Sequence, residues 1–191
     1  MKRPLPGIVF LRGSAVTILV ALYVENTPTT SNANDDDSYA LLVEQPRVPI
    51  GQVACLELPA GMMDDASSNS NRQSVTGIAV QEIQEECGIA IDASELVNLT
   101  ELALQTPVRR GNLPVAAIAP SPGGCDEFCR VLYLEKSVTV EELSAMRGRL
   151  QGLQENHGEH ITLRVVPLDQ VWSVSGDAKA IVYVYTHLLL A

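Results

Sequence analysis

The sequence predicts a mixed α/β fold in which a mixed β-sheet is sandwiched between α-helices. Apolar runs rich in Val, Ile and Leu, such as AVTILVALYV at 15–24, are typical of buried strands. These runs alternate with segments whose caps and spacing indicate helices, which predicts helical layers on a sheet. Apolar residues make up 46% of the 191 residues, enough for one sizeable core. We therefore expect a single domain over residues 1–191.

Apolar periodicity and turn residues define the expected elements in order. Strands are expected at 14–24, 39–44 and 53–58, with the polar hairpin loop ENTPTTSNANDDDS between the first two. A helix is expected at about 74–87, before a Gly stop at Gly88. Strand-like runs follow at 96–104, 114–119 and 129–134. Thr139 and Glu142 form a capping box that opens a helix at 139–150. A strand at 161–168 and a closing helix, GDAKAIVYVYTHLLL, complete the order.

The acid-rich run VQEIQEECGI at 80–89 is the most informative segment for function. Glu82, Glu85 and Glu86 stand at i, i+3 and i+4, and therefore share one helix face. No Lys or Arg lies within four residues to relieve their repulsion. Several carboxylates without an internal cation favour a hard divalent ion. A solvated acidic face is the alternative, but the turn Pro59-Ala60-Gly61 upstream and the Gly stop favour a phosphate and metal scaffold.

These residues resemble the box of the Nudix hydrolases. That box reads Gly, five residues, Glu, seven residues, Arg-Glu, an aliphatic residue, one residue, Glu-Glu, one residue, Gly and an aliphatic residue. Here Gly61 opens it, and residues 82–89 fill its second half, so the catalytic box lies at about 61–89. The metal-binding pattern Glu-x-x-Glu-Glu is intact.

The chain departs from the box in three ways. An insertion at about 64–74 lengthens its first half, Gln81 stands at the Arg position, and Gln73 stands nine residues before Glu82 where the middle Glu is absent. In the family that Glu and that Arg pair structurally. Because both are lost together, no orphan charge remains, and we interpret the change as an altered brace.

The resemblance continues outside the box through YALLVEQPRVPIG, SPGGCDE and HGEHITLRVVPLDQVW. It indicates the ADP-ribose and nucleotide-sugar pyrophosphatase branch, with plant-type ADP-sugar and UDP-sugar diphosphatases most similar, and it covers most of residues 6–190. It implies a Nudix fold and metal-dependent hydrolysis of a nucleoside diphosphate sugar to a nucleoside monophosphate and a sugar phosphate. It does not distinguish ADP-ribose from ADP-glucose or UDP-glucose.

The resemblance also implies a metal site. The carbonyl of Ala60 and the carboxylates of Glu82, Glu85 and Glu86 would hold Mg²⁺, with Mn²⁺ as a possible substitute, and two or three ions are plausible. The alternative for Ala60 is a plain turn.

Further residues are implied to contact the substrate. Glu57 would approach the site, although an ordinary strand glutamate is equally expected. Arg47 would contact phosphate or ribose, because a guanidinium fork suits phosphate oxygens; an exposed surface arginine is the alternative. One of Arg109 and Arg110 would meet the diphosphate, without an indication of which.

The two remaining motifs supply a substrate loop and a catalytic loop. In SPGGCDE, Gly124 and Glu127 would contact substrate, and in dimeric relatives the residue at Glu127 reaches the neighbouring subunit's site, which predicts a homodimer. In HGEH, Glu159 is the best match to the catalytic carboxylate, with Glu155 and His157 as alternatives. Glu85 is the other residue predicted to be catalytic.

Composition narrows the partners and the compartment. A net charge of −10 argues against binding nucleic acid or an anionic membrane surface. The four Cys form no C-x-x-C pair, which predicts reduced thiols in the cytoplasm. Lys2 and Arg3 before an apolar run imitate a signal peptide, but interrupting Pro and Gly residues argue against one.

Two other functions remain open at this stage. Gln81 and the box insertion are compatible with a catalytically weak Nudix-like module that binds and senses a nucleotide. A nucleoside triphosphatase would keep the metal site but gains no support from SPGGCDE or HGEH.

Overall fold

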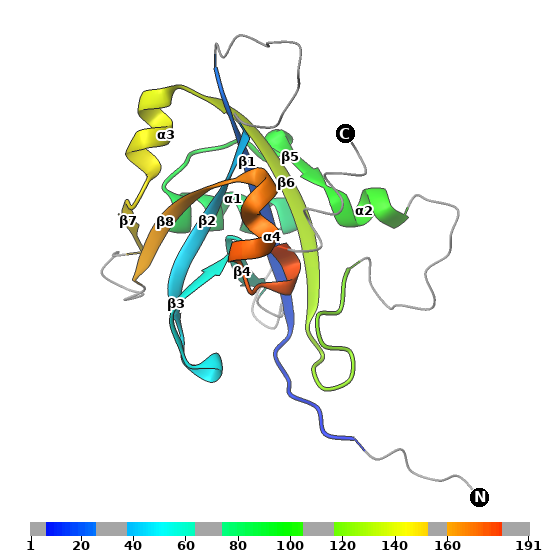
Figure 1. Ribbon diagram of the computed structural model, residues 1–191. Helices are drawn as coiled ribbons and strands as arrows, with labels where there is room; N and C mark the ends of the chain where they lie inside the picture. The colour runs from blue at the N-terminus through cyan, green and yellow to red at the C-terminus, as the bar shows by residue number, and fades with distance from the viewer. Residues whose placement is uncertain (1–6, 26–37, 64–73, 105–116, 153–159, 181–191) are drawn as a thin grey trace, which may run out of the picture.

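The computed structural model describes residues 7–25, 38–63, 74–104, 117–152 and 160–180, and every structural statement below concerns these residues. Eight strands form one sheet in the order β5-β6-β1-β2-β8-β7, with β3 paired to β2 and β4 paired to β1 (Figure 1). β1 runs parallel to β6, and the other pairings are antiparallel. The sheet is therefore mixed, as the sequence predicts.

The strands are β1 Ser14–Val24, β2 Ser38–Arg47, β3 Gln52–Glu57, β4 Ala60–Met63, β5 Leu96–Asn98, β6 Phe128–Val138, β7 Leu150–Gln151 and β8 Ile161–Pro167. The α-helices are α1 Val75–Glu82, α2 Leu99–Leu104, α3 Val140–Met146 and α4 Val171–Val174. A π-helical turn, Ile83–Cys87, follows α1 directly, and 3-10 turns lie at Val48–Ile50, Ala93–Glu95 and Leu168–Gln170. Among these residues, none of the helices is long and apolar enough to cross a membrane.

Both faces of the sheet are buried, because the side chains of β1 alternate between two apolar clusters. Val16, Ile18, Val20 and Leu22 pack in the cluster that includes Ala79 and Ile83 of the box helix and Leu143 of α3. Leu19 and Ala21 pack in the second cluster, which includes Leu168 and Val171. Figure 1 shows α1 and α4 on opposite sides of the sheet. The predicted sheet between helical layers is confirmed.

The candidate site lies where β1 and β2 separate. The second half of β1 pairs with β2 at Val20↔Leu41, whereas its first half pairs with β4 at Thr17↔Ala60. The chain leaves β3, which pairs with β2, and crosses to β1 through Leu58 and Pro59. Because the N–H of Ile18 donates to the carbonyl of Pro59 at 2.8 Å, this crossing is fixed to β1. LELPAG therefore spans the fork between the two strands.

Most predicted elements are confirmed, and the capping box is confirmed in detail. The hydroxyl of Thr139 accepts from the N–H of Glu142 at 3.1 Å, and the Glu142 carboxylate accepts from the N–H of Thr139 at 2.8 Å. The helix that they open ends earlier than predicted, at Met146.

The strand predicted at 96–104 is wrong beyond Asn98. The side chain of Asn98 accepts from the N–H of Glu101 at 3.1 Å, and α2 begins directly after Asn98. Asn favours such helix starts because its amide oxygen satisfies a free N–H. Within the predicted strand 114–119, Ile118 forms only an isolated bridge to Cys129, and 114–116 lie outside the described residues. Residues 178–180 begin the predicted closing helix, and the rest of it also lies outside.

Candidate active site

The box helix is built to turn its acids toward the fork. Ser74 caps α1, accepting from the N–H of Gly77 at 3.0 Å, and Gly88 ends the following π-helical turn with a φ of 63°. A left-handed residue at that point suits glycine, which lacks a Cβ. The π-turn leaves Glu86 only 5% exposed, and such turns are frequent at functional sites.

Two box carboxylates lie against the start of β4. The N–H of Ala60 donates to Oε2 of Glu86 at 3.0 Å. Gly61 lies so close to Glu82 that a Cβ at Gly61 would stand 1.9 Å from Oε1 of Glu82. The structure thus brings together three of the residues that the resemblance implies for the metal site, Ala60, Glu82 and Glu86, with Gly61, which opens the box.

Glu85 is held by a different contact. Its Oε1 accepts from Nε2 of Gln81 at 2.9 Å, on the exposed side of the helix. Gln81, at the Arg position of the box, thus orients a box carboxylate through a neutral amide.

The donor set fits a hard divalent cation in its chemistry. Carboxylate oxygens and a backbone carbonyl are the ligands that Mg²⁺ and Mn²⁺ prefer, and the absent Cβ of Gly61 leaves room for the Glu82 carboxylate. Over the described ranges, no three His, Cys, Asp or Glu side chains converge closely enough to hold a metal by themselves. Glu85 and Glu86 point to Gln81 and to the N–H of Ala60, so coordination by all three acids requires side-chain rotation.

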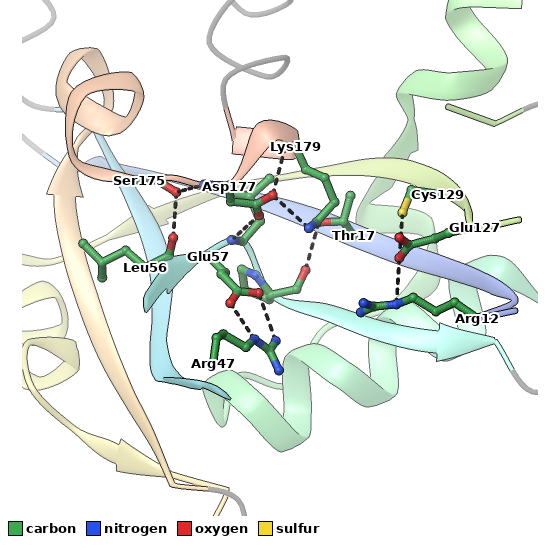
Figure 2. Close-up of polar contacts among 12 residues, drawn as sticks. Arg12, Thr17, Arg47, Leu56, Glu57, Glu127, Cys129, Ser175, Asp177 and Lys179 are labelled. Atoms are coloured by element: carbon green, nitrogen blue, oxygen red, sulfur yellow. Dashed lines mark hydrogen bonds and ion pairs between the residues drawn. The ribbon is translucent and has the colours of Figure 1, made fainter. Parts of the chain in front are cut away.

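Arg47 and Glu57, both expected to contact substrate, contact each other. Nε of Arg47 donates to Oε1 of Glu57 at 2.6 Å, and a second guanidinium nitrogen donates to Oε2 at 2.9 Å (Figure 2). Burial alone would raise the pKa of Glu57, but the hydrogen bond and charge of Arg47 lower it overall. The hydrogen bond that Arg47 donates to Glu57 raises the pKa of Arg47 against the effect of burial, and the charge of Glu86 adds to the rise. Arg47 therefore interacts electrostatically with the box carboxylate Glu86 as well as with Glu57.

The SPGGCDE loop is fastened to the segment that leads into β1. The N–H of Phe10 donates to the carbonyl of Gly124 at 2.8 Å. Nε of Arg12 lies 3.2 Å from Oε1 of Glu127, which also accepts from the thiol of Cys129 at 3.7 Å. Burial raises the pKa of Cys129 to about 12, so that its thiol keeps its proton as a donor. Glu127 is thus held at the parallel β1–β6 pair.

Sequence comparison agrees with this geometry. No protein-family model matches the chain. The chain is 39% identical over 176 residues to "Nudix hydrolase 14, chloroplastic" of Arabidopsis thaliana, a match that covers 92% of this chain and 49% of the relative. It therefore spans about half the length of the curated relative that it matches.

The chain belongs to the Nudix hydrolase superfamily. The eight-stranded mixed sheet with helices on both faces is consistent with the Nudix fold. The relative's name places that protein in the chloroplast, so it gives no support to the predicted cytoplasmic location of this one.

This Nudix chain also uses residues that sequence reasoning missed. The hydroxyl of Ser175 donates to the carbonyl of Leu56 at 2.7 Å, and the N–H of Leu58 donates to Oδ2 of Asp177 at 3.3 Å. Nζ of Lys179 lies 2.8 Å from Oδ1 of Asp177. No local signal could have found these contacts, because 119 residues separate the partners of each hydrogen bond. From the sequence, Asp177 is expected only near the start of the closing helix, GDAKAIVYVYTHLLL.

The other predicted Nudix site residues lie outside the described residues: Arg109, Arg110, Glu155, His157 and Glu159. Their roles stay predictions.

Proposed function

We propose that this protein hydrolyses the pyrophosphate bond of a nucleoside diphosphate sugar, such as ADP-ribose or ADP-glucose, to a nucleoside monophosphate and a sugar phosphate. The observation that carries the proposal is the contact of Ala60 and Gly61 with Glu86 and Glu82 at the strand fork. The likeness of SPGGCDE and HGEH to the nucleotide-sugar branch supports the choice of substrate class.

The metal in this proposal is Mg²⁺, which Mn²⁺ could replace. The Ala60 carbonyl and Glu82, Glu85 and Glu86 would hold it. When bound, the ion neutralises phosphate charge and lowers the pKa of water. For Glu85 this means leaving the amide of Gln81, a contact on the exposed side of the helix that breaks at little cost.

The remaining residues would bind substrate and move the proton. Arg47 would exchange one carboxylate oxygen of Glu57 for a phosphate oxygen, a planar match that a guanidinium makes with either anion. Glu57 would then keep one of its two hydrogen bonds to the guanidinium, which keeps Arg47 oriented. Gly124 and Glu127 would line the sugar side, and Arg109 or Arg110 would meet the diphosphate.

The general base in this proposal is Glu159, whose carboxylate would accept the proton of the attacking water. Glu155 and His157 remain the alternatives within the same loop. A homodimer, in which Glu127 reaches the neighbouring site, and a cytoplasmic location also belong to the proposal. The negative net charge argues against nucleic acid or an anionic membrane surface as the partner.

A panel of nucleoside diphosphate sugars, incubated with Mg²⁺ and analysed by product identification, tests the proposal. We expect equimolar nucleoside monophosphate and sugar phosphate from at least one member, and no product when the metal is chelated. The Gln81–Glu85 bond favours a second candidate, a nucleotide sensor, because it engages a box acid. Metal-dependent nucleotide binding without turnover would favour that candidate.

A further inference from the structure

Ser175, Asp177 and Lys179, the C-terminal clamp, grip the strand segment that leads to Ala60. Ser175 and Asp177 are 6% and 9% exposed, so both contacts are shielded from water. The N–H of Asp177 donates to the hydroxyl of Ser175 at 3.1 Å, which joins the two contacts into one unit. Figure 2 shows the three side chains gathered over Leu56 and Glu57, with Arg47 reaching Glu57 from the other side.

The grip falls on alternate backbone groups of the same short segment. Ser175 holds the carbonyl of Leu56, and Asp177 holds the N–H of Leu58. On the far side of Leu58, Ile18 and Thr17 hold the carbonyl of Pro59 at 2.8 and 3.3 Å. The path of the chain into Ala60 is therefore set by contacts on both sides of Leu58. On the side toward β3, the clamp adds to the pairing of Leu56 and Glu57 with β2.

Lys179 supplies the charge that such a buried carboxylate needs. The side chains of Lys179 and Asp177 are 21% and 5% exposed. Burial alone would lower the pKa of Lys179, but the charge of Asp177 raises it overall, so the ammonium stays protonated at neutral pH. The charge of Glu57 acts in the same direction. An isolated carboxylate would be costly to bury here, and the ion pair with Lys179 offsets part of that cost.

We propose that Ser175 and Asp177, with Lys179 as counter-ion, are positioning residues that set the Ala60 carbonyl for metal binding by fixing Leu56 and Leu58. The inference rests on the proposed function, since Ala60 is a ligand only in a metal-dependent Nudix site. Releasing the segment lets Ala60 drift relative to Glu82 and Glu86 on the box helix. Metal affinity then falls although no ligand has changed.

A matched pair of double variants isolates the hydrogen bond to Leu58. Asp177→Asn/Lys179→Met and Asp177→Ala/Lys179→Met both lack the ion pair, but only the first retains a side-chain oxygen for the N–H of Leu58. Mn²⁺ affinity is measured by the loss of the free-ion electron paramagnetic resonance signal, well below each variant's melting temperature. We expect the Ala double variant to bind Mn²⁺ about fivefold to tenfold more weakly than the Asn double variant, the size of one buried hydrogen bond. Ser175→Ala, which removes only the Leu56 contact, should weaken Mn²⁺ binding in the same direction.

Melting temperature and turnover separate this role from plain stability and from the proposed function. If the Ala double variant melts lower but binds Mn²⁺ as the Asn double variant does, the clamp is only structural and the inference is overturned. If the Ala double variant does not fold, Ser175→Ala decides alone, and unchanged Mn²⁺ affinity overturns the inference. If the variants differ in Mn²⁺ affinity as expected but the wild type hydrolyses no nucleotide sugar, the result contradicts the proposed function and supports the clamp. A wild-type protein that binds no Mn²⁺ overturns both.

Discussion

Replacing Gly61 with Ala should damage the site while leaving the sheet in place. Gly61 lies in β4, paired with Val16 of β1, and its backbone suits any residue. The added Cβ would stand 1.9 Å from Oε1 and 2.1 Å from Cδ of Glu82, whereas ordinary contact begins at 3.4 Å. The Glu82 carboxylate must therefore move by about 1.5 Å. It can do so, because it is the flexible end of a half-buried side chain.

The two expected consequences differ in size. Forcing Glu82 off its preferred rotamer costs about 1 kcal/mol, which lowers the melting temperature of a chain of this length by roughly 2–4 °C. A misplacement of about 1 Å in a catalytic group can cost roughly 10²-fold in rate, so kcat should fall by about that factor. Mn²⁺ binding should weaken in parallel because the same carboxylate is predicted to be a ligand.

Circular dichroism, melting and steady-state hydrolysis of the best nucleotide sugar provide the assay. Gly7→Ala is the matched control, because a Cβ at Gly7 meets nothing within 4 Å. A Gly61→Ala protein that folds and keeps kcat and Mn²⁺ affinity within about threefold of wild type would refute the placement of Glu82 in the working site.

Three further predictions test the flanking contacts. The pKa of Glu57 is lowered in the folded protein, so the pair with Arg47 stabilises the fold at pH values above the ordinary pKa of 4.5, and this stabilisation is lost as the pH falls through the lowered pKa. Arg47→Met should therefore lower the unfolding free energy by about 1 kcal/mol at pH 7 and flatten its acid dependence in denaturant titrations. An unchanged profile would contradict the pairing. Gln81→Arg should change kcat by less than about threefold, because an Arg reaches the same Glu85 oxygen and gains no second acid; a large gain would show that Gln81 limits catalysis and favour the sensor. Glu159→Gln should depress kcat more than it raises KM, whereas full activity would move the base to Glu155 or His157, or to metal alone.

Local signals allowed the sequence to predict the parts of the fold that depend on neighbours along the chain. The strand predicted at 14–24 has the bounds of β1, Ser14–Val24, and the predicted capping box at Thr139–Glu142 marks a real helix start. The spacing of Glu82 and Glu86 placed both acids on one face because helical geometry is local. That face does meet Ala60 and Gly61, as the box resemblance implies.

Long-range pairing decided the rest. β4 Ala60–Met63 was missed because four residues after a Pro turn carry little strand signal, and its pairing partner lies in β1. The clamp joins residues that are 119 positions apart, so no spacing rule predicts it. The Arg47–Glu57 pair lies across the β2–β3 hairpin, whose bulge between Gln45 and Arg47 shifts the register. Charge alone could not show that two predicted substrate contacts satisfy each other.

One comparison tests the central claim most directly: the products formed from a nucleoside diphosphate sugar by the wild type and by Glu86→Gln, each with and without Mg²⁺. The Gln side chain retains an oxygen for the N–H of Ala60, so the fork should keep its structure while the predicted ligand loses its charge. We expect the wild type to release equimolar nucleoside monophosphate and sugar phosphate only with Mg²⁺, and the variant to do so about 10²-fold more slowly. Absence of these products from the wild type, or equal rates in the two proteins, would contradict the claim that Glu86 at the strand fork forms part of a metal-dependent pyrophosphatase site.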